Sequence, residues 1–144
     1  MYHLLYTSHA TKEFSEHDLL QLLTQSRSLN KQNNITGMLL YLNGKFMQVL
    51  EGDQLTVEDI YSKIRKDPRH SRIITVIQGN SPGRIFSGWT MGFKKISIND
   101  AQKLSGYHNI DNFFKKQLVK EDGNLLLVFL GLFYKKNIVD YAEL

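Results

Sequence analysis

Cysteine is absent from the 144-residue sequence, and proline occurs only twice. Without cysteine the chain can form no disulfide and has no thiolate for catalysis. One proline follows Asp67, where we expect it to end a helix, because the residue before proline avoids helical backbone angles. The other lies in residues 81–84, which we expect to form a turn.

Long apolar runs are also lacking. The longest, residues 125–133, is too short to span a bilayer and is interrupted by Gly131. The N-terminus has neither the basic segment nor the apolar segment of a secretory signal. We therefore expect a cytoplasmic protein that does not enter the membrane.

Common catalytic and metal-binding motifs are missing as well. The sequence contains no G-x-G-x-x-G, P-loop, H-E-x-x-H or G-x-S-x-G pattern. Its five histidines do not recur at the spacing of metal ligands. We expect neither an enzyme nor a metal site.

The composition that remains is that of a folded, mildly basic protein. Hydrophobic residues make up 42% and charged residues 22%, with a net charge of +4 and a pI of about 9.2. These values are typical of one globular domain. The positive charge is compatible with nucleic acid or an acidic partner but requires neither.

Turn signals and apolar periodicity divide the chain into short elements. We predict a strand over residues 2–10, a helix over 15–33, a hairpin over 35–52, a helix over 53–67, strands over 72–79 and 84–96, and two or three helices over 99–144. Ser15 is a candidate N-cap for the first helix. In the last strand, alternation places Trp89 and Met91 on one face.

The order β-α-β-β-α-β-β, followed by helices, predicts an α+β fold. It is that of a ferredoxin-like sandwich with one additional strand. Both helices should then cover the same face of the sheet, and the first and third strands should be neighbours at its centre. We expect residues 1–96 to form the folded domain and residues 97–144 a helical extension that packs on the sheet.

Polar side chains face the covered side of this fold. Asn43-Gly44 predicts a type I′ turn, and the resulting register places Gln48 opposite Leu39 on an apolar face. Tyr6, in the middle of the first strand, can then reach Gln48, provided that the registers of the first and third strands agree. Two explanations are open: these groups satisfy each other or the backbone, as buried polar groups usually do, or they read the amide-like edge of a bound ligand.

The sequence resembles a BLUF domain, a blue-light sensor that binds flavin. The motifs I-T-G-x-L-x-Y, F-x-Q-x-L-E-G, D-P-R-H and W-x-M occur in this order, and the matching runs cover roughly the first two thirds of the chain. The resemblance implies that Tyr6 is the photoactive tyrosine, Gln48 the essential glutamine and Asn30 a ligand of the flavin ring edge. It implies further flavin contacts at Leu22, Phe46, Leu50, Lys63, Ile64, Asp67, Arg69 and His70, and a rearrangement around the glutamine at Ser26, Trp89 and Met91.

The implied cofactor is FAD, with FMN as the alternative. In the implied mechanism Tyr6 donates an electron and then a proton to the excited flavin, and Gln48 carries the proton. Gln48 is left rotated or tautomerised, and the absorption shifts to the red. The resemblance also implies a homo-oligomer and a protein partner whose binding depends on light. Leu29 and Asn34 depart from the family pattern, and we interpret both as variation.

Two other functions fit the same order of elements. An RNA-binding module of the RRM type needs several aromatic residues on its third strand, whereas residues 44–52 hold one aromatic and an acidic end. A ferredoxin-like domain could also bind a small ligand without photochemistry. A flavin spectrum that shifts to the red under blue light would distinguish the sensor from both.

Overall fold

The structure is a computed structural model, and it describes residues 1–95 except 43, 81, 85 and 89. The elements are β1 (Tyr2–Ala10), α1 (Glu16–Gln32), β2 (Thr36–Leu42), β3 (Lys45–Gly52), α2 (Gln54–Arg65), β4 (His70–Asn80) and β5 (Gly92–Lys95). Their order is the predicted one. The helical extension expected over residues 97–144 lies outside the described residues.

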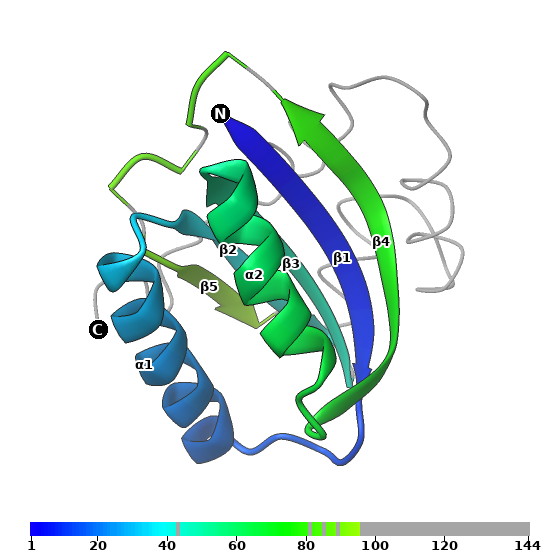
Figure 1. Ribbon diagram of the computed structural model, residues 1–144. Helices are drawn as coiled ribbons and strands as arrows, with labels where there is room; N and C mark the ends of the chain where they lie inside the picture. The colour runs from blue at the N-terminus through cyan, green and yellow to red at the C-terminus, as the bar shows by residue number, and fades with distance from the viewer. Residues whose placement is uncertain (43, 81, 85, 89, 96–144) are drawn as a thin grey trace, which may run out of the picture.

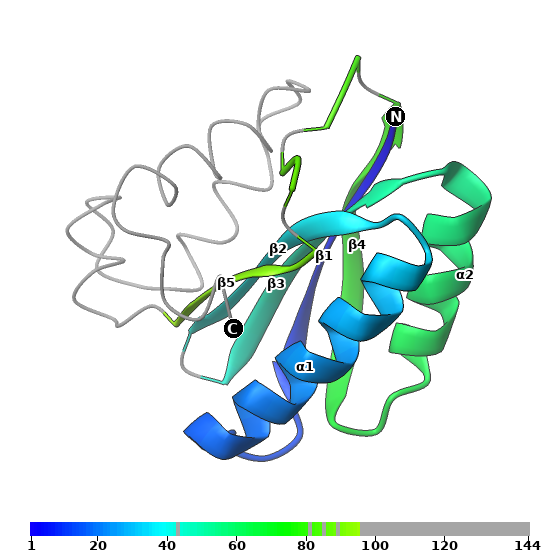
Figure 2. The same ribbon diagram turned by 90° about the vertical axis from the view of Figure 1, so that its left-hand side faces the viewer.

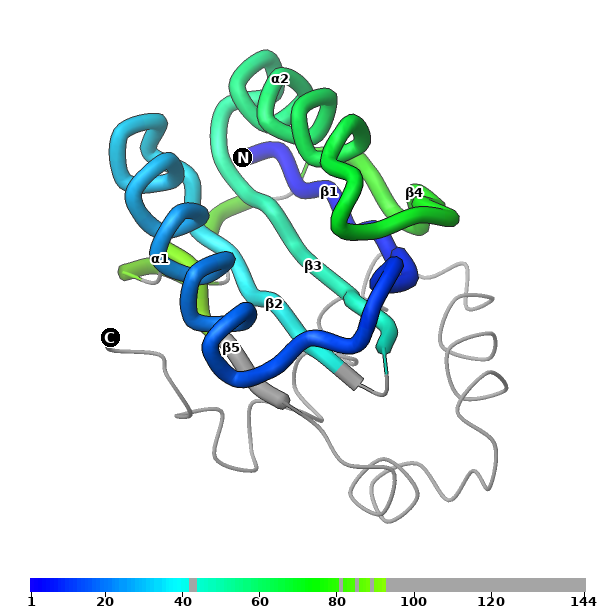
Figure 3. Tube along the Cα trace, turned by 90° about the horizontal axis from the view of Figure 1, so that it is seen from below, coloured from blue at the N-terminus to red at the C-terminus, as the bar shows by residue number. Residues whose placement is uncertain are grey.

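The strands form one mixed sheet in the order β4-β1-β3-β2-β5. The pairs β1–β3, β1–β4 and β2–β3 are antiparallel, whereas β5 runs parallel to β2. Both helices lie on the same face of the sheet (Figures 1 and 2), and the view from below shows them side by side above the strands (Figure 3). The predicted ferredoxin-like α+β fold is therefore confirmed, with β1 and β3 as neighbours at the centre.

The first helix begins at the predicted N-cap. The Ser15 hydroxyl accepts a hydrogen bond from the Asp18 N–H at 3.1 Å, and the Asp18 carboxylate accepts one from the Ser15 N–H at 3.0 Å. This reciprocal capping box satisfies two backbone donors that would otherwise lack partners.

Of the two described helices, neither is long and apolar enough to span a membrane.

The hairpin between β2 and β3 has the register that the Asn43-Gly44 turn predicts. Leu39 lies opposite Gln48, and Gly44 has a φ of 76°, which a residue with a side chain rarely adopts. Gln48 therefore points toward the helices, together with Phe46 and Leu50.

The main core lies between this face and the two helices. Its buried members are Tyr2, Leu4, Tyr6, Phe14, Leu19, Leu23, Ile35, Leu39, Tyr41, Phe46, Leu50, Val57, Ile60, Tyr61 and Met91. Alternate residues of the central strands turn to the other face. There Leu5, Met47 and Val49 are also buried, although no described helix covers that side. Large aromatic side chains are thus concentrated on the helix side.

The last strand is much shorter than predicted. Instead of covering residues 84–96, β5 begins at Gly92. Described residues before β5 are bonded to side chains: the Phe86 N–H donates to Glu51 Oε1 at 2.7 Å, and the Thr90 and Met91 carbonyls accept from Asn30 and Arg27. Gly88 also has a φ of 82°, which breaks an extended conformation. Met91 therefore precedes the strand, and the alternation proposed for Trp89 falls partly outside the described residues.

Candidate functional site

A cavity of about 220 Å³ opens between α1 and α2, with β1, β2 and β3 as its floor. It is lined by Tyr6, Phe14, Leu22, Gln25, Ser26, Leu29, Leu39, Phe46, Gln48, Ile60, Lys63, Ile64, Asp67, Arg69 and His70. This volume is below the ~300–1,000 Å³ of sites that enclose a drug-sized ligand. The cavity can therefore hold the buried part of a ligand whose remainder lies nearer the surface.

The polar pair at the floor is Tyr6 and Gln48. They lie directly opposite each other on β1 and β3, and the Tyr6 hydroxyl donates a hydrogen bond to Gln48 Oε1. This confirms the predicted contact. Burial raises the pKa of Tyr6 far above its usual value, with smaller contributions from Tyr61 and Asp67. The phenol is therefore held in its neutral, proton-donating form.

The two ends of the Gln48 amide have different partners. While Oε1 accepts from Tyr6, Nε2 lies 3.5 Å from the sulfur of Met91 and donates to it. A thioether is a weak acceptor. The amide is therefore bonded strongly at one end and weakly at the other.

Aromatic rings fix the position of Tyr6. Its ring centroid lies 5.2 Å from that of Tyr61 and 6.2 Å from that of His70, which meets it edge-on. The His70 Nε2–H donates to the Ile64 carbonyl at 2.6 Å, and Nδ1 lies 2.8 Å from the Ser8 hydroxyl. Both ring nitrogens of His70 thus have hydrogen-bond partners, one in α2 and one in β1, so that His70 connects the end of α2 to β1 beside Tyr6.

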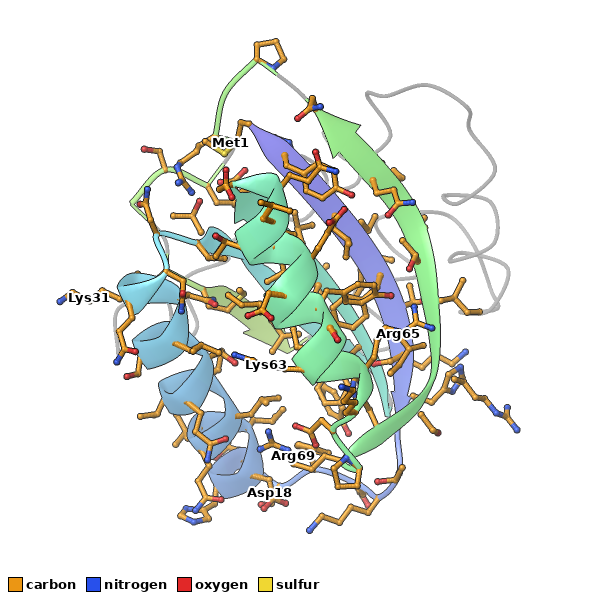
Figure 4. All side chains as sticks on the ribbon, in the orientation of Figure 1. Met1, Asp18, Lys31, Lys63, Arg65 and Arg69 are labelled. Carbon is orange, nitrogen blue, oxygen red and sulfur yellow. The ribbon has the colours of Figure 1, made fainter. Side chains whose placement is uncertain are left out.

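Charged residues lie at the end of the cavity formed by the turn after α2. Arg69 donates to Asp67 through Nη2 at 2.6 Å and through Nε at 3.0 Å, and to Gln25 Oε1 at 3.2 Å. These hydrogen bonds from Arg69 lower the pKa of Asp67. Figure 4 shows Lys63 and Arg69 directed toward α1. Lys63 Nζ also pairs with the Asp59 carboxylate at 3.3 Å.

Most of the residues predicted for the site line the cavity together. These are Tyr6, Leu22, Ser26, Phe46, Gln48, Lys63, Ile64, Asp67, Arg69 and His70. Leu50 does not line it, because it is fully buried in the core. Asn30 is 2% exposed, and its Nδ2 donates to the Thr90 carbonyl at 2.7 Å. Met91 contacts Gln48 from outside the cavity, and Trp89 lies outside the described residues.

Sequence reasoning missed five lining residues: Phe14, Gln25, Leu29, Leu39 and Ile60. Gln25 and Leu29 could have been found from the sequence, because they lie three and seven residues after Leu22 and therefore share its face of the helix. Phe14 had no such signal, because it precedes α1 in an irregular segment. Its ring meets that of Phe46 edge-on, with 5.1 Å between centroids. Only the folded chain brings these two aromatics together.

The described residues offer no cluster of three or more His, Asp or Glu side chains that could hold a metal ion. The lining instead combines apolar walls, the amide–phenol pair of Gln48 and Tyr6, and a polar end where the cations Lys63 and Arg69 are paired with Asp59 and Asp67. Such a site fits a flat ring with a hydrogen-bonding edge and an anionic extension.

A family model described as BLUF, sensors of blue-light using FAD, matches residues 1–92. The chain belongs to the BLUF family. Its members use FAD, and a BLUF relative has been solved with FMN: the structure of Klebsiella pneumoniae BlrP1 with FMN and cyclic diGMP has 25% identity and a TM-score of 0.66, over 91% of this chain and 34% of that one.

Two further BLUF relatives differ in how much of their own length this chain covers. The photoactivated adenylate cyclase subunit beta of Euglena gracilis is 40% identical over 89 residues, which are 61% of this chain and 10% of that protein. This chain thus spans about a tenth of that relative's length. The photo-activated state of BlsA has 29% identity and a TM-score of 0.75, over 90% of this chain and 91% of that one. The likeness therefore extends to a protein of similar length.

Proposed function

We propose that this BLUF protein is a blue-light receptor whose switch is the hydrogen bond between Tyr6 and Gln48. The observation that supports the proposal is the position of this pair. Both side chains are buried, 4% and 5% exposed, and both line the cavity between the helices. A ligand in the cavity would therefore contact the two groups that are able to exchange a proton.

The lining residues fit FAD, which when bound supplies blue-light absorption and an excited state that accepts an electron. In this proposal Leu22 of α1 and Ile64 of α2 hold the ring from opposite sides. Lys63 and Arg69 face the phosphates, where cationic donors are favourable. Asn30 can contact the ring edge through Oδ1 or the second Nδ2 hydrogen while Nδ2 keeps its hydrogen bond to the Thr90 carbonyl.

Tyr6 is the electron and proton donor in this proposal. In the dark its raised pKa keeps the proton on the phenol, because the buried anion would be poorly solvated. When Tyr6 loses an electron, its hydroxyl becomes strongly acidic, and the proton can move toward Gln48 Oε1. That atom already accepts the Tyr6 hydrogen bond, so no side chain has to move first.

The electron and the proton then return to Tyr6, which regains its hydroxyl, and the Gln48 amide is left reversed, with its two ends exchanged. Nε2 would face Tyr6, whose hydroxyl can accept, and Oε1 would face the Met91 sulfur, which cannot donate. A buried acceptor without a donor costs about 1–3 kcal/mol unless another donor reaches it. The reversed arrangement is therefore higher in free energy than the original one, and the protein returns to the dark arrangement thermally.

The decisive experiment is optical. The purified protein should be yellow, with a flavin spectrum that shifts to the red under blue light and recovers in darkness. The RNA-binding and simple ligand-binding alternatives predict no light-induced shift. A colourless protein that takes up neither added FAD nor added FMN would contradict the proposal.

We further propose that the output is a light-dependent change in self-association or in binding to a partner protein. The Euglena relative is a photoactivated cyclase, so BLUF proteins include ones coupled to an enzyme. Size-exclusion chromatography in darkness and under blue light, with and without candidate partners, tests this output. An elution volume that does not change with light, together with no partner binding, would contradict it.

A further inference from the structure

The backbone that leads into β5 is held by side chains of α1. Arg27 Nε donates to the Met91 carbonyl at 2.9 Å, and Asn30 Nδ2 donates to the Thr90 carbonyl at 2.7 Å. Arg27 and Asn30 are three residues apart and therefore lie on the same face of the helix. Two successive carbonyls of the connection are thus fixed by one helix face.

This anchoring determines where the Met91 side chain lies. Methionine has three rotatable side-chain bonds and adapts to many environments, so its side chain alone does not define one position. Fixing the carbonyls on both sides of the Met91 α-carbon sets the direction of its side chain. Met91 is 1% exposed, and its sulfur lies 3.5 Å from Gln48 Nε2.

Partial burial of the Arg27 side chain has an electrostatic cost, because it lowers the pKa of the guanidinium. An arginine on a surface helix can normally extend into water. Here the side chain turns toward the sheet and donates to a backbone carbonyl. A hydrogen bond from a charged donor to a carbonyl partly compensates for such burial.

We propose that Arg27 is a positioning residue for the Gln48 switch: it holds the Met91 backbone so that the Met91 sulfur receives Gln48 Nε2 in the dark arrangement. The inference rests on the proposed photoreceptor function for its kinetic consequence. Its structural consequence, a defined position of Met91, does not depend on light. The two can therefore be tested separately.

The first test is the methyl NMR spectrum of the flavin-loaded protein in darkness, with labelled methionine. Four methionines are present, and the Met91 signal is assigned by its loss in Met91→Leu. Arg27→Met, which removes the donor, should shift or broaden the Met91 signal. Arg27→Lys, which keeps a cationic donor, should restore it partly. Lys31→Met removes the same charge from the exposed end of α1, where Lys31 points away from α2 (Figure 4), and should leave the signal unchanged.

The second test is the rate of dark recovery after blue light. Recovery requires Met91 to be in place when Nε2 returns, so Arg27→Met should slow it about threefold to tenfold, and tenfold corresponds to about 1.4 kcal/mol. In a Met91→Leu background the same substitution should have no further effect, because residues that act through one contact are not additive. If Arg27→Met does not fold, Arg27→Gln, whose shorter amide falls short of the Met91 carbonyl, replaces it with the same expectations.

The inference is overturned if the Met91 signal and the recovery rate of the Arg27 variant equal those of the wild type. Equal slowing in the Met91→Leu background would also overturn it, because Arg27 would then act elsewhere. A wild-type protein without any light response would contradict the proposed function instead, and the methyl spectrum in darkness would still test the position of Met91.

Discussion

Tyr6 and Gln48 face each other directly across β1 and β3, and the phenol donates to the amide oxygen. Neighbouring strands place opposed side chains about 4.5–5.5 Å apart at Cβ, so the contact follows from the strand register. Because both side chains are nearly excluded from solvent, neither can replace the other with water. A change in one must therefore change the hydrogen bonding of the other.

Gln48→Leu should retain the flavin and lose the light-induced red shift. Leucine fills nearly the same space but has no amide to reverse. The substitution also leaves the Tyr6 hydroxyl without its acceptor, which should cost about 1–3 kcal/mol of stability. Difference absorption spectra before and after blue light check the first expectation, and urea unfolding checks the second.

Gln21→Leu is the matched control for this substitution. Gln21 is an exposed residue of α1 that does not line the cavity between the helices. Its replacement should leave both the spectrum and the photocycle unchanged. A Gln48→Leu protein with a normal red shift would show that Gln48 is not part of the switch.

Tyr6→Phe should change how stability depends on alkaline pH. Burial raises the pKa of Tyr6 above its usual value of 10.0, so the folded protein keeps a proton that the unfolded chain releases. This contribution to stability is fully present below about pH 10 and decreases as the pH rises further, by up to about 1.4 kcal/mol per pH unit. Phenylalanine has no proton to lose.

The measurement is the free energy of unfolding of wild type and Tyr6→Phe at about pH 8 and about pH 11. The free energy of unfolding of the wild type should decrease relative to that of Tyr6→Phe at the higher pH. Comparing the two proteins cancels the titration of lysines and other tyrosines. An energy difference that is the same at both pH values would show that Tyr6 titrates normally.

The Tyr6–Gln48 contact could be predicted because it depends on local rules. The Asn43-Gly44 turn sets the register of β2 and β3, and period-two alternation sets which face Gln48 occupies. The adjacency of β1 and β3 required a choice of fold, and their register, which places Tyr6 opposite Gln48, was established only by the structure. Residues of this kind can be assigned before a structure is known.

The connection before β5 could not be predicted in the same way. Alternating apolar residues indicate a buried face, but here side chains of Arg27, Asn30 and Glu51 replace the hydrogen bonds of a strand partner. Glu51 looked like the acidic end of a strand in the sequence. Its burial depends on partners from three distant segments, and no periodic pattern reveals such a meeting.

Glu51→Ala should be among the most destabilising substitutions in the described part of the chain. The carboxylate is fully buried and lies within hydrogen-bonding distance of His3 Nε2 at 2.8 Å, the Thr36 hydroxyl at 2.6 Å and the Phe86 N–H at 2.7 Å. Removing one member of a buried charged network leaves the others without partners and costs about 3–5 kcal/mol. Urea unfolding measures this loss.

Glu58→Ala provides the control for the loss of a carboxylate. Glu58 is exposed on α2 and accepts one hydrogen bond from Gln54 at 3.1 Å. Its removal should change the free energy of unfolding by no more than about 0.5 kcal/mol. Similar effects of the two substitutions would mean that the Glu51 network does not stabilise the fold.

Arg69→Met should raise the pKa of Asp67 toward its ordinary value. In the wild type the hydrogen bonds from Arg69 lower this pKa below 3.8, so the pair contributes stability above that pH and loses it as the pH falls through the folded-state pKa. Both side chains are partly exposed, at 37% and 26%, so solvent limits the contribution to about 1 kcal/mol or less. An NMR titration of the Asp67 carboxyl measures the shift.

The same substitution should weaken retention of FAD if Arg69 faces the phosphates. Arg65→Met is the matched control: its guanidinium carbon lies 5.4 Å above the Tyr61 ring, and Figure 4 shows Arg65 on the side of α2 away from α1. Arg65→Met should leave both the Asp67 pKa and FAD retention unchanged. Equal loss of FAD in the two variants would indicate a general effect of charge.

Gly37→Ala and Gly44→Ala should separate two reasons for glycine in the same hairpin. A Cβ at Gly44 would meet no heavy atom within 4 Å, so alanine there has only the strain of a φ of 76°, about 1–2 kcal/mol. A Cβ at Gly37 would overlap the Val49 carbonyl oxygen and lie 3.2 Å from Met91 Cε. The obstacle at Gly37 is strand backbone, which cannot move without opening the pairing of β2 and β3. We therefore expect Gly44→Ala to fold with a normal photocycle. Gly37→Ala should lose about 3 kcal/mol or more of its free energy of unfolding, or remain insoluble.

Soluble yield and urea unfolding of both variants measure this difference. A Gly37→Ala protein as stable as Gly44→Ala would show that β2 does not approach β3 as closely as the structure places it.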